Sequence, residues 1–432
     1  MPSWLSDLPI ERDQVLIPVY VVAALLLVVL LVPRPGTGWR LRTRVGVLAA
    51  AAGVGALLGW LAVYEVVDVQ DLFGAPASDV IRAAATGAGA GLGLAVVNLV
   101  RTRWWRKVVA IIAIPAVVAA AGVMINRDVA YYPRFGDVFG DTGVKTLSID
   151  PDGGAGHTLK DWTPPADMPT TGTVGTRSIP GTVSRWKGRD AWIYLPPAAL
   201  VKNPPKLPVI VAFSGEPGSP SDVFLAGNMA EYLDAIAAKH KGIAPIVVVP
   251  DQLGSYSANP MCVDSKLGNV ATYVTVDVRD WILQNLPVST NRLSWTAAGF
   301  SEGATCAVQF VTQYHAIFSS AIAVSPELGP RNGSVAHTIK VGFHGSVKDY
   351  RAAQPIAIMK KVGHYPATSI AFSVGDQDRR YGADAGLLAT EARKVGIHVH
   401  YKLLLDLGHN WNTGAAGLAN GLSVLTPWWK LP

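Results

Sequence analysis

A serine flanked by two glycines is the first feature of this sequence that could carry out chemistry. Gly299-Phe300-Ser301-Glu302-Gly303 has the pattern G-x-S-x-G, follows an apolar run at 293–300 and precedes a helical pattern at 304–314. In this setting the pattern is typical of a nucleophile elbow, a strained turn between strand and helix where larger side chains at the glycine positions would collide with neighbouring backbone. The motif therefore predicts Ser301 as the nucleophile of an acyl-transfer reaction.

A serine hydroxyl needs a base to take its proton, and a histidine oriented by a carboxylate commonly serves. In folds with such an elbow, the three catalytic residues follow one another along the chain in the order serine, acid, histidine. His409 follows the last predicted strand, at 398–405, and is therefore the expected base. Three histidines lie before the strand at 368–375 and are out of order: His337, His344 and His364. His398 and His400 alternate along a strand and could face a metal together, but no third ligand is evident, so we expect neither metal nor cofactor.

The acid is expected directly after the strand at 368–375, in Gly375-Asp376-Gln377-Asp378. We favour Asp378 over Asp376, because two further residues past the strand end give the loop room to bring a carboxylate to the imidazole. The other aspartate would then serve in a turn or at a helix start.

An oxyanion needs preorganised hydrogen-bond donors. One expected donor is the backbone N–H of Glu302, the residue after the nucleophile. The second is expected in Ser214-Gly215-Glu216-Pro217-Gly218, which follows the apolar run 208–213. Pro217 has no N–H, so we favour the N–H of Glu216, with Gly215 as the second choice.

Only two cysteines are present, Cys262 and Cys306, which excludes a four-cysteine zinc site and a disulfide-dense scaffold. We predict that they form a disulfide that ties the loop after the strand at 245–250 to the helix behind Ser301. For a loop of 43 residues the chain-entropy model gives roughly 3–4 kcal/mol of stabilisation. Two buried thiols are the alternative.

These residues must be positioned by a layered fold. From residue 176 to 432, short β-rich runs alternate with helical patterns, which predicts an α/β domain with a mainly parallel sheet. The predicted strands lie at 191–195, 208–213, 245–250, 293–300, 319–325, 368–375 and 398–405. The predicted helices lie at 222–239, 268–285, from 302, and at 383–395.

Residues 1–126 have a different character, with four apolar stretches that approach the ~20 residues needed to span a bilayer. They lie at 14–32, 45–64, 78–100 and 107–125, and residues 127–175 are expected to form a connector to the catalytic domain. Glycines at four-residue spacing, Gly55/Gly59 and Gly89/Gly93, predict close helix packing rather than a dinucleotide loop.

Arginine and lysine concentrate in the first and third connections of this region, and acidic residues in the second. Because basic residues favour the cytoplasmic side, both termini and the catalytic domain are predicted to lie outside. Charged residues make up 16% of the chain against about 25% in soluble proteins, which argues against a purely cytosolic enzyme. Residues 128–432 hold 26 basic and 24 acidic groups, a balance that argues against a nucleic-acid partner.

Five motifs in order, PVIVAFSGEPG, VVVPD, GFSEGA, SVGDQD and LGHNW, resemble the esterase D and bacterial mycolyltransferase group of the α/β-hydrolase superfamily. The resemblance covers about residues 180–430 and none of the membrane region. It implies an α/β-hydrolase fold and ester chemistry by Ser301, Asp378 and His409, in some members with transfer of the acyl group to a sugar. Relatives commonly have His-Gly or Asp-Gly where this chain has Ser214-Gly215, which leaves the second oxyanion donor open.

The sequence therefore predicts a membrane-anchored, extracytoplasmic serine esterase that acts on membrane lipids or envelope acyl esters. Alternatives are an acyltransferase of the mycolyl type, a hydrolase that removes aminoacyl groups from phospholipids, and a non-enzymatic binding or scaffold module on a hydrolase fold. The scaffold hypothesis is disfavoured because nucleophile, acid and base are all present in the expected order. A transporter is disfavoured because Arg82 is the only ionisable residue well inside a predicted span.

Overall fold

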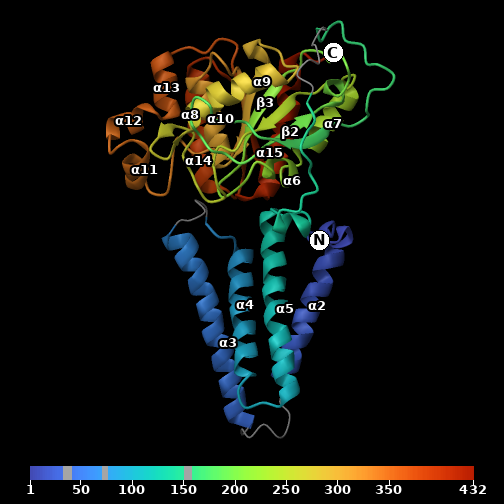
Figure 1. Ribbon diagram of the computed structural model, residues 1–432. Coiled ribbons are helices and arrows are strands. Elements are labelled where there is room, and N and C mark those ends of the chain that lie inside the picture. The colour runs from blue at the N-terminus through green and yellow to red at the C-terminus, as the bar shows by residue number, and fades with distance from the viewer. Residues whose placement is uncertain (33–40, 71–75, 150–157) are drawn as a thin grey trace. The chain divides into compact units, whose positions relative to one another are not determined.

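The computed structural model describes residues 1–32, 41–70, 76–149 and 158–432 (Figure 1). The chain divides into two compact units, Met1–Thr142 and Gly143–Pro432. The described residues do not include three charged residues of the connections between the apolar stretches: Arg34, Arg40 and Asp71.

Four long helices form the N-terminal unit, and each is long and apolar enough to cross a membrane. They are α2 (Asp13–Leu31), α3 (Leu41–Val63) with its π-helical continuation η1 (Tyr64–Val69), α4 (Asp79–Val97) and α5 (Trp104–Val129). Two short elements complete the unit, α1 (Ser3–Ser6) and the 3₁₀ turn η2 (Gly136–Phe139). The prediction of four apolar helices is confirmed, with boundaries close to those expected from the sequence.

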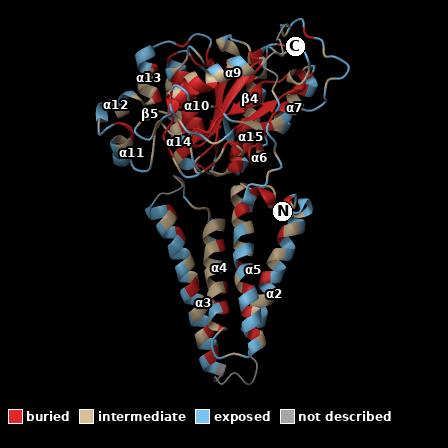
Figure 2. Ribbon diagram, in the orientation of Figure 1, coloured by how far each residue is buried: buried red, intermediate tan, exposed pale blue. Residues whose placement is uncertain are grey.

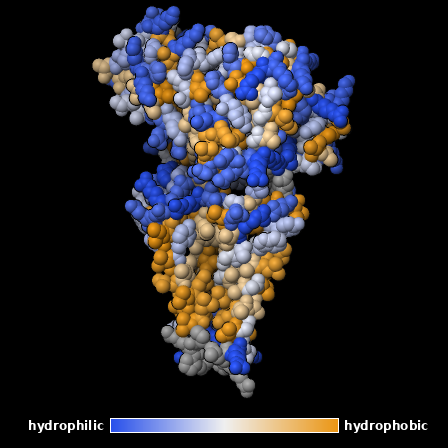
Figure 3. All heavy atoms as spheres, turned by 180° about the vertical axis from the view of Figure 1, so that it is seen from behind, coloured by the Kyte–Doolittle hydropathy of each residue, from blue (hydrophilic) through white to orange (hydrophobic). Residues whose placement is uncertain are grey.

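The outward faces of these helices are apolar, as the hydrophobic surface along them in Figure 3 shows. Leu25 and Leu58 are each 61% exposed, and Ile111 is 59% exposed. A soluble bundle turns such side chains inward and covers its outside with polar groups. The composition of this surface therefore suits contact with lipid.

Small residues bring α3 and α4 together, as the glycine spacing predicts. A Cβ atom added to Gly55 would overlap the carbonyl group of Gly89, and one added to Gly93 would overlap that of Ala51. Backbone approach this close requires glycine, so the glycine pattern is a helix-packing feature.

One arginine counted with the basic loops is buried instead. Arg106, near the start of α5, is 1% exposed and donates to Asn98 Oδ1 and to the carbonyl oxygens of Leu30 and Val32 at the end of α2. It satisfies carbonyl groups that the last turn of a helix leaves without intrahelical donors.

An eight-stranded sheet forms the centre of the C-terminal unit, in the order β1-β2-β4-β3-β7-β8-β9-β10. β1 and β2 pair antiparallel, as do β2 and β4, and the other neighbours are parallel. The strands are β1 (Thr173–Arg177), β2 (Ala191–Leu195), β3 (Val209–Phe213), β4 (Ile246–Val249), β7 (Trp295–Phe300), β8 (Ser320–Val324), β9 (Ser369–Gly375) and β10 (His398–Leu404). β5 (Asp264–Ser265) and β6 (Gly268–Asn269) form a separate hairpin.

Helices cover both faces of this sheet because its inner strands are buried along their whole length, whereas the edge strand β10 is mostly exposed. Ala321 and Ala323 of β8 share a core cluster with α10, whereas Ile322 and Val324 contact α15. The helices include α6 (Asp222–Leu225), α7 (Met229–Lys239), α8 (Val270–Thr272), α9 (Arg279–Asn285), α10 (Glu302–Gln313), α11 (Val335–Gly342), α12 (Val347–Ala352), α13 (Pro355–Val362), α14 (Arg379–Lys394) and α15 (Trp411–Leu425). Figure 2 shows the buried sheet between them. The predicted α/β-hydrolase architecture is confirmed.

Several elements differ from the prediction, among them α14, which begins at Arg379 and not at 383. The helix expected at 222–239 is divided into α6 and α7, and the segment 268–285 starts with β6 and contains a π-helical turn, η4 (Tyr273–Val278). The segment expected to be a connector contributes β1, and its Leu147 and Trp162 are buried in the core of the C-terminal unit. These are isolated apolar residues in a polar segment, so no periodic pattern marks them.

Candidate active site

Ser301 lies in the sharp turn between β7 and α10, with φ 58° and ψ −120°. A Cβ atom on Gly299 would overlap the backbone of Gly303, and one on Gly303 would overlap the carbonyl group of Phe213 in β3. Both glycines are therefore required for the strand, the turn and the helix to approach so closely. This is the local geometry that the G-x-S-x-G pattern predicts.

The structure brings Ser301, His409 and Asp378 together from three separate loops. Ser301 Oγ lies 2.9 Å from His409 Nε2, and His409 Nδ1 lies 2.7 Å from Asp378 Oδ2. Each of these loops follows a parallel strand, so they meet at the carboxyl edge of the sheet. Asp378 is 5% exposed and Ser301 7% exposed, so the hydrogen bonds of this group are largely shielded from water.

Asp376, the alternative acid, occupies a different position. Its side chain is exposed and its Oδ1 accepts a hydrogen bond from the backbone N–H of Leu407, two residues before the histidine. Asp376 therefore holds the turn that carries His409, while Asp378 contacts the imidazole itself.

Two aromatic rings enclose the imidazole of His409. The ring of Tyr381 is stacked on it, with centroids 3.8 Å apart and an interplanar angle of 20°, and Phe300 packs at 5.0 Å. Tyr381 comes from the first turn of α14, three residues after Asp378. This spacing places the acid and the stacking ring on one side of the helix start. Tyr381 is not among the residues predicted from the sequence, although its three-residue spacing from Asp378 is a usable signal.

Both segments expected to form the oxyanion hole lie beside Ser301. Glu302 is the first residue of α10, where a backbone N–H has no intrahelical acceptor. A Cβ atom on Gly215 would lie 3.5 Å from the Cβ of Ser301, so the loop 214–218 borders the nucleophile. Gly215 and Glu216 both remain candidates for the second donor.

Two polar side chains hold this loop in place, and the sequence analysis missed both. Gln252 donates to the carbonyl oxygen of Ser214 at 2.8 Å, and Arg189 donates to that of Gly218 at 3.0 Å. Arg189 also binds both carboxylate oxygens of the fully buried Asp251 at 2.7 and 2.8 Å. Asp251 and Gln252 could have been found by position alone, because they directly follow the run that forms β4, whereas Arg189 had no such signal.

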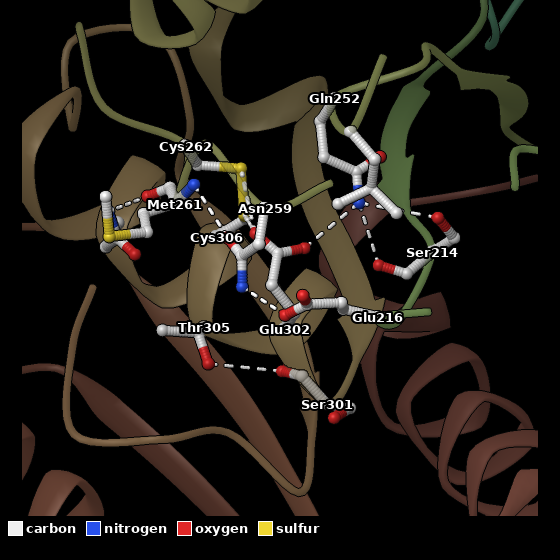
Figure 4. Close-up of a disulfide and its surroundings, with 12 residues drawn as sticks. Ser214, Glu216, Gln252, Asn259, Met261, Cys262, Ser301, Glu302, Thr305 and Cys306 are labelled. Atoms are coloured by element: carbon white, nitrogen blue, oxygen red, sulfur yellow. Dashed lines mark hydrogen bonds between the residues drawn. A yellow bond between two sulfur atoms is a disulfide. The ribbon is translucent and has the colours of Figure 1, made fainter. Parts of the chain in front are cut away.

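Two carboxyl groups lie near the nucleophile, that of Glu302 buried and that of Glu216 half-buried (Figure 4). Burial raises the pKa of Glu302 from an ordinary 4.5 to about 8 and that of Glu216 to about 7. Glu302 accepts from Gln252 Nε2 at 3.1 Å, and Glu216 accepts from Asn259 Nδ2. At neutral pH the Glu302 side chain is therefore mainly protonated.

The predicted disulfide between Cys262 and Cys306 is present, with Cα atoms 5.6 Å apart. It joins the loop after β4 to α10, and Glu302 Oε1 lies 2.9 Å from Cys306 Sγ. The same loop carries Asn259, the partner of Glu216. The disulfide therefore fastens the segment that supports one wall of the site.

The profile of the Esterase family matches residues 187–404. A protein of Corynebacterium glutamicum, itself uncharacterized, is 30% identical over 341 residues, which are 76% of this chain and 78% of that protein. This share exceeds the length of the C-terminal unit, so the similarity extends into the N-terminal helical unit.

Solved structures share the fold of the C-terminal unit. An S-formylglutathione hydrolase from Agrobacterium tumefaciens has a TM-score of 0.51 at 17% identity, covering 61% of this chain and 98% of that chain. A ferulic acid esterase has a TM-score of 0.51 at 16% identity, covering 60% of this chain and 99% of that chain.

Proposed function

Because this chain belongs to the esterase family, we propose that it is a membrane-anchored serine esterase that works outside the cytoplasm on a lipid or cell-envelope ester. The observation that carries the proposal is the hydrogen-bonded series Ser301, His409 and Asp378 at the carboxyl edge of the sheet. Each member of the series is oriented for one step of acyl transfer.

In the proposed reaction Ser301 Oγ attacks the ester carbonyl carbon while its proton passes to His409 Nε2. The Asp378 carboxylate accepts from Nδ1–H, which fixes the tautomer and stabilises the imidazolium. The N–H of Glu302 and one N–H of the loop 214–218 would bind the carbonyl oxygen as it becomes negative. His409 then protonates the leaving alcohol, and water activated by the same base releases the acid from the acyl-enzyme.

The four apolar helices, whose exposed faces suit lipid, support the proposed membrane attachment. Anchoring would raise the effective concentration of a lipid substrate at the site. The disulfide supports an extracytoplasmic location, because such bonds persist mainly in oxidising compartments.

A labelling experiment tests this location. Single cysteines at Thr37 and Ala75, two positions outside the described residues, should react oppositely with a membrane-impermeant thiol reagent. Ala75→Cys should react in intact cells and Thr37→Cys only after lysis. Reaction of Thr37→Cys in intact cells would contradict the proposed orientation.

A second candidate is an ester whose acyl group carries an amino group, as in aminoacyl-phospholipids. Glu216 favours it, since its half-buried carboxyl belongs to the loop that borders Ser301. Burial raises the pKa of this carboxyl to about 7, and a neighbouring ammonium group would favour its ionised form. Glu327 adds negative potential to this region, because its charge helps to raise the pKa of the neighbouring Glu302 carboxyl.

Matched esters distinguish the two candidates. The full chain in detergent is given alanyl and butyryl esters with the same alcohol, and Glu216→Gln is measured beside the wild type. The aminoacyl hypothesis expects the wild type to prefer the alanyl ester and the variant to lose that preference at unchanged butyryl turnover. If the wild type and Glu216→Gln show the same ratio of alanyl-ester to butyryl-ester turnover, the neutral lipid ester remains the proposed substrate class.

Added glycerol, trehalose or a phospholipid headgroup alcohol tests the acyltransferase alternative in the same assay. If an acylated acceptor accumulates faster than free acid at millimolar acceptor, transfer replaces hydrolysis as the proposed reaction. A scaffold role predicts no turnover of any ester.

A further inference from the structure

Gln252, in the loop after β4, is fully buried and binds both segments that border the nucleophile. Its Nε2 donates to the carbonyl oxygen of Ser214 at 2.8 Å and to Glu302 Oε2 at 3.1 Å, and Ser214 Oγ lies further away at 3.4 Å. A side-chain amide has two N–H protons, so the two nearer acceptors use both of them. One side chain therefore joins the loop 214–218 to the first residue of α10, as Figure 4 shows.

The carbonyl group of Ser214 sets the direction of the next N–H group. In a planar trans peptide unit the C=O and the following N–H point in opposite directions, and the Ser214–Gly215 bond is trans. Because the carbonyl group points at Gln252, the N–H of Gly215 points away from Gln252, to the side on which Ser301 lies in Figure 4. Within the described residues this N–H makes no hydrogen bond. It can therefore donate to an oxyanion beside Ser301.

The second contact of Gln252 acts on the other expected donor, the N–H of Glu302. That N–H lies at the start of α10, and the Glu302 side chain is 6% exposed and held by the amide of Gln252. The start of α10 also packs on the carbonyl group of Ser214, because a Cβ atom on Gly303 would lie 2.5 Å from that oxygen. Gln252 thus fixes the position of one donor relative to the other.

We propose that Gln252 is a positioning residue of the oxyanion hole, whose amide directs the N–H groups of Gly215 and Glu302 to one point beside Ser301 Oγ. This role rests on the proposed function, and it assigns the second donor to Gly215 instead of Glu216. Gln252 does not touch the substrate. It acts through the two residues that it joins.

Loss of the amide would leave the Ser214 carbonyl without this donor. Ser214 is fully buried, and a buried carbonyl group without a hydrogen bond is costly. If the Ser214–Gly215 peptide unit turns over to find another donor, its carbonyl oxygen takes the place of the N–H and repels the oxyanion. Removal of one oxyanion donor lowers kcat roughly 100- to 1000-fold, so a peptide unit that is misdirected part of the time should cost somewhat less.

Gln252→Met removes the donor at nearly the same side-chain length, and Gln309→Met is the matched control. Gln309 is also buried, its Nε2 donates to the carbonyl oxygen of Met261 at 3.2 Å, and it lies about two turns further along α10. In both glutamines Oε1 is buried without a partner among the described residues. The two variants therefore lose equivalent contacts at different distances from the nucleophile.

The variants are assayed as full chains in detergent, with p-nitrophenyl butyrate as substrate and a butyl trifluoromethyl ketone as inhibitor. Addition of Ser301 Oγ to the ketone presents an oxyanion to the same donors, so the affinity of this inhibitor follows stabilisation of the transition state. Gln252→Met should lower kcat roughly 30-fold with KM nearly unchanged, and weaken the inhibitor by a similar factor. Gln309→Met should keep all three quantities within twofold of the wild type, even where its Tm falls as far.

Gln252→Glu keeps the shape of the side chain and tests the donor again if Gln252→Met does not fold. An ionised carboxyl group cannot donate to the Ser214 carbonyl, so kcat of this variant relative to the wild type should fall between pH 6 and pH 9. A relative kcat near one at pH 9 would overturn the positioning role.

Two results of the first comparison would also overturn it: kcat of Gln252→Met within twofold of the wild type, or equal losses in Gln252→Met and Gln309→Met. A loss confined to KM would do the same, because it would indicate a role in substrate binding. A wild type that neither hydrolyses the ester nor reacts with a fluorophosphonate at Ser301 is a different result, since it would contradict the proposed function itself.

Discussion

Replacement of Glu302 by glutamine should make the protein more stable at alkaline pH while leaving it nearly unchanged at acid pH. Glu302 is 6% exposed, and burial is the main cause that raises its pKa to about 8. In the unfolded chain the same carboxyl titrates near 4.5. Between these two values the native state keeps the proton and the unfolded state loses it, so the free energy of unfolding decreases as pH rises. Above pH 8 the full loss has occurred.

The magnitude follows from the difference between the two pKa values. One pKa unit corresponds to about 1.4 kcal/mol, so ionisation of this side chain removes about 5 kcal/mol of stability at most. For a unit of this size, 1 kcal/mol changes Tm by about 2–4 °C. A glutamine does not titrate, and its amide can still pair with Gln252, whose Oε1 is buried without a partner among the described residues. The Tm gained by Glu302→Gln should therefore grow by roughly 5–15 °C between pH 5 and pH 9.

The assay is thermal unfolding of the full chain in detergent, followed by tryptophan fluorescence at pH 5, 7 and 9. Glu231→Gln, on the exposed side of α7, serves as the matched control and should give a constant difference from the wild type. The contributions of other titrating groups to Tm cancel when the variant and the wild type are compared at the same pH. If the gain from Glu302→Gln is the same at pH 5 and pH 9, the argument from a buried, protonated carboxyl is wrong.

Three further outcomes are expected. Asp378→Asn should lower kcat roughly 10⁴-fold without a change of fold, because the asparagine favours the wrong imidazole tautomer. Asp376→Asn should lower kcat far less, and the reverse order of the two effects would exchange the roles of the two aspartates. Replacing Cys262 and Cys306 by serine should lower the free energy of unfolding by roughly 3–4 kcal/mol in chemical denaturation, and an unchanged midpoint would contradict this. In the wild type, kcat should decrease above about pH 8, because the ionised Glu302 side chain disfavours an oxyanion bound at the backbone N–H of Glu302. The Glu302→Gln variant should not show that decrease.

Much of the fold could be predicted from the sequence because its signals are local. A G-x-S-x-G pattern between an apolar strand and a helix specifies a sharp turn, and the positions of Gly299 and Gly303 against backbone explain why. Long apolar stretches likewise identify membrane-length helices without knowledge of their partners. Strand order, by contrast, is set by contacts between distant segments, and β1 lies in a segment whose composition is that of a loop.

The supporting residues of the site could not be predicted for the same reason. Arg189 holds the loop 214–218 through Gly218 and Asp251, and nothing in the neighbourhood of Arg189 in the sequence indicates that contact. Tyr381 follows Asp378 at a spacing that places both on one helix turn, but its stack on His409 depends on how β10 ends. Chemical type and chain order therefore predict the candidate reacting groups, and tertiary packing determines which side chains surround them.

The central claim, that Ser301 is the nucleophile of an esterase, is tested most directly by identifying the residue that a fluorophosphonate probe modifies. Full-length protein in detergent is labelled, digested and examined by mass spectrometry, with Ser301→Ala at matched expression and Tm as the control. The account predicts one modified peptide, with the probe on Ser301, and loss of both labelling and ester hydrolysis in the variant. Modification of a different serine, or hydrolysis by Ser301→Ala at the wild-type rate, would contradict it.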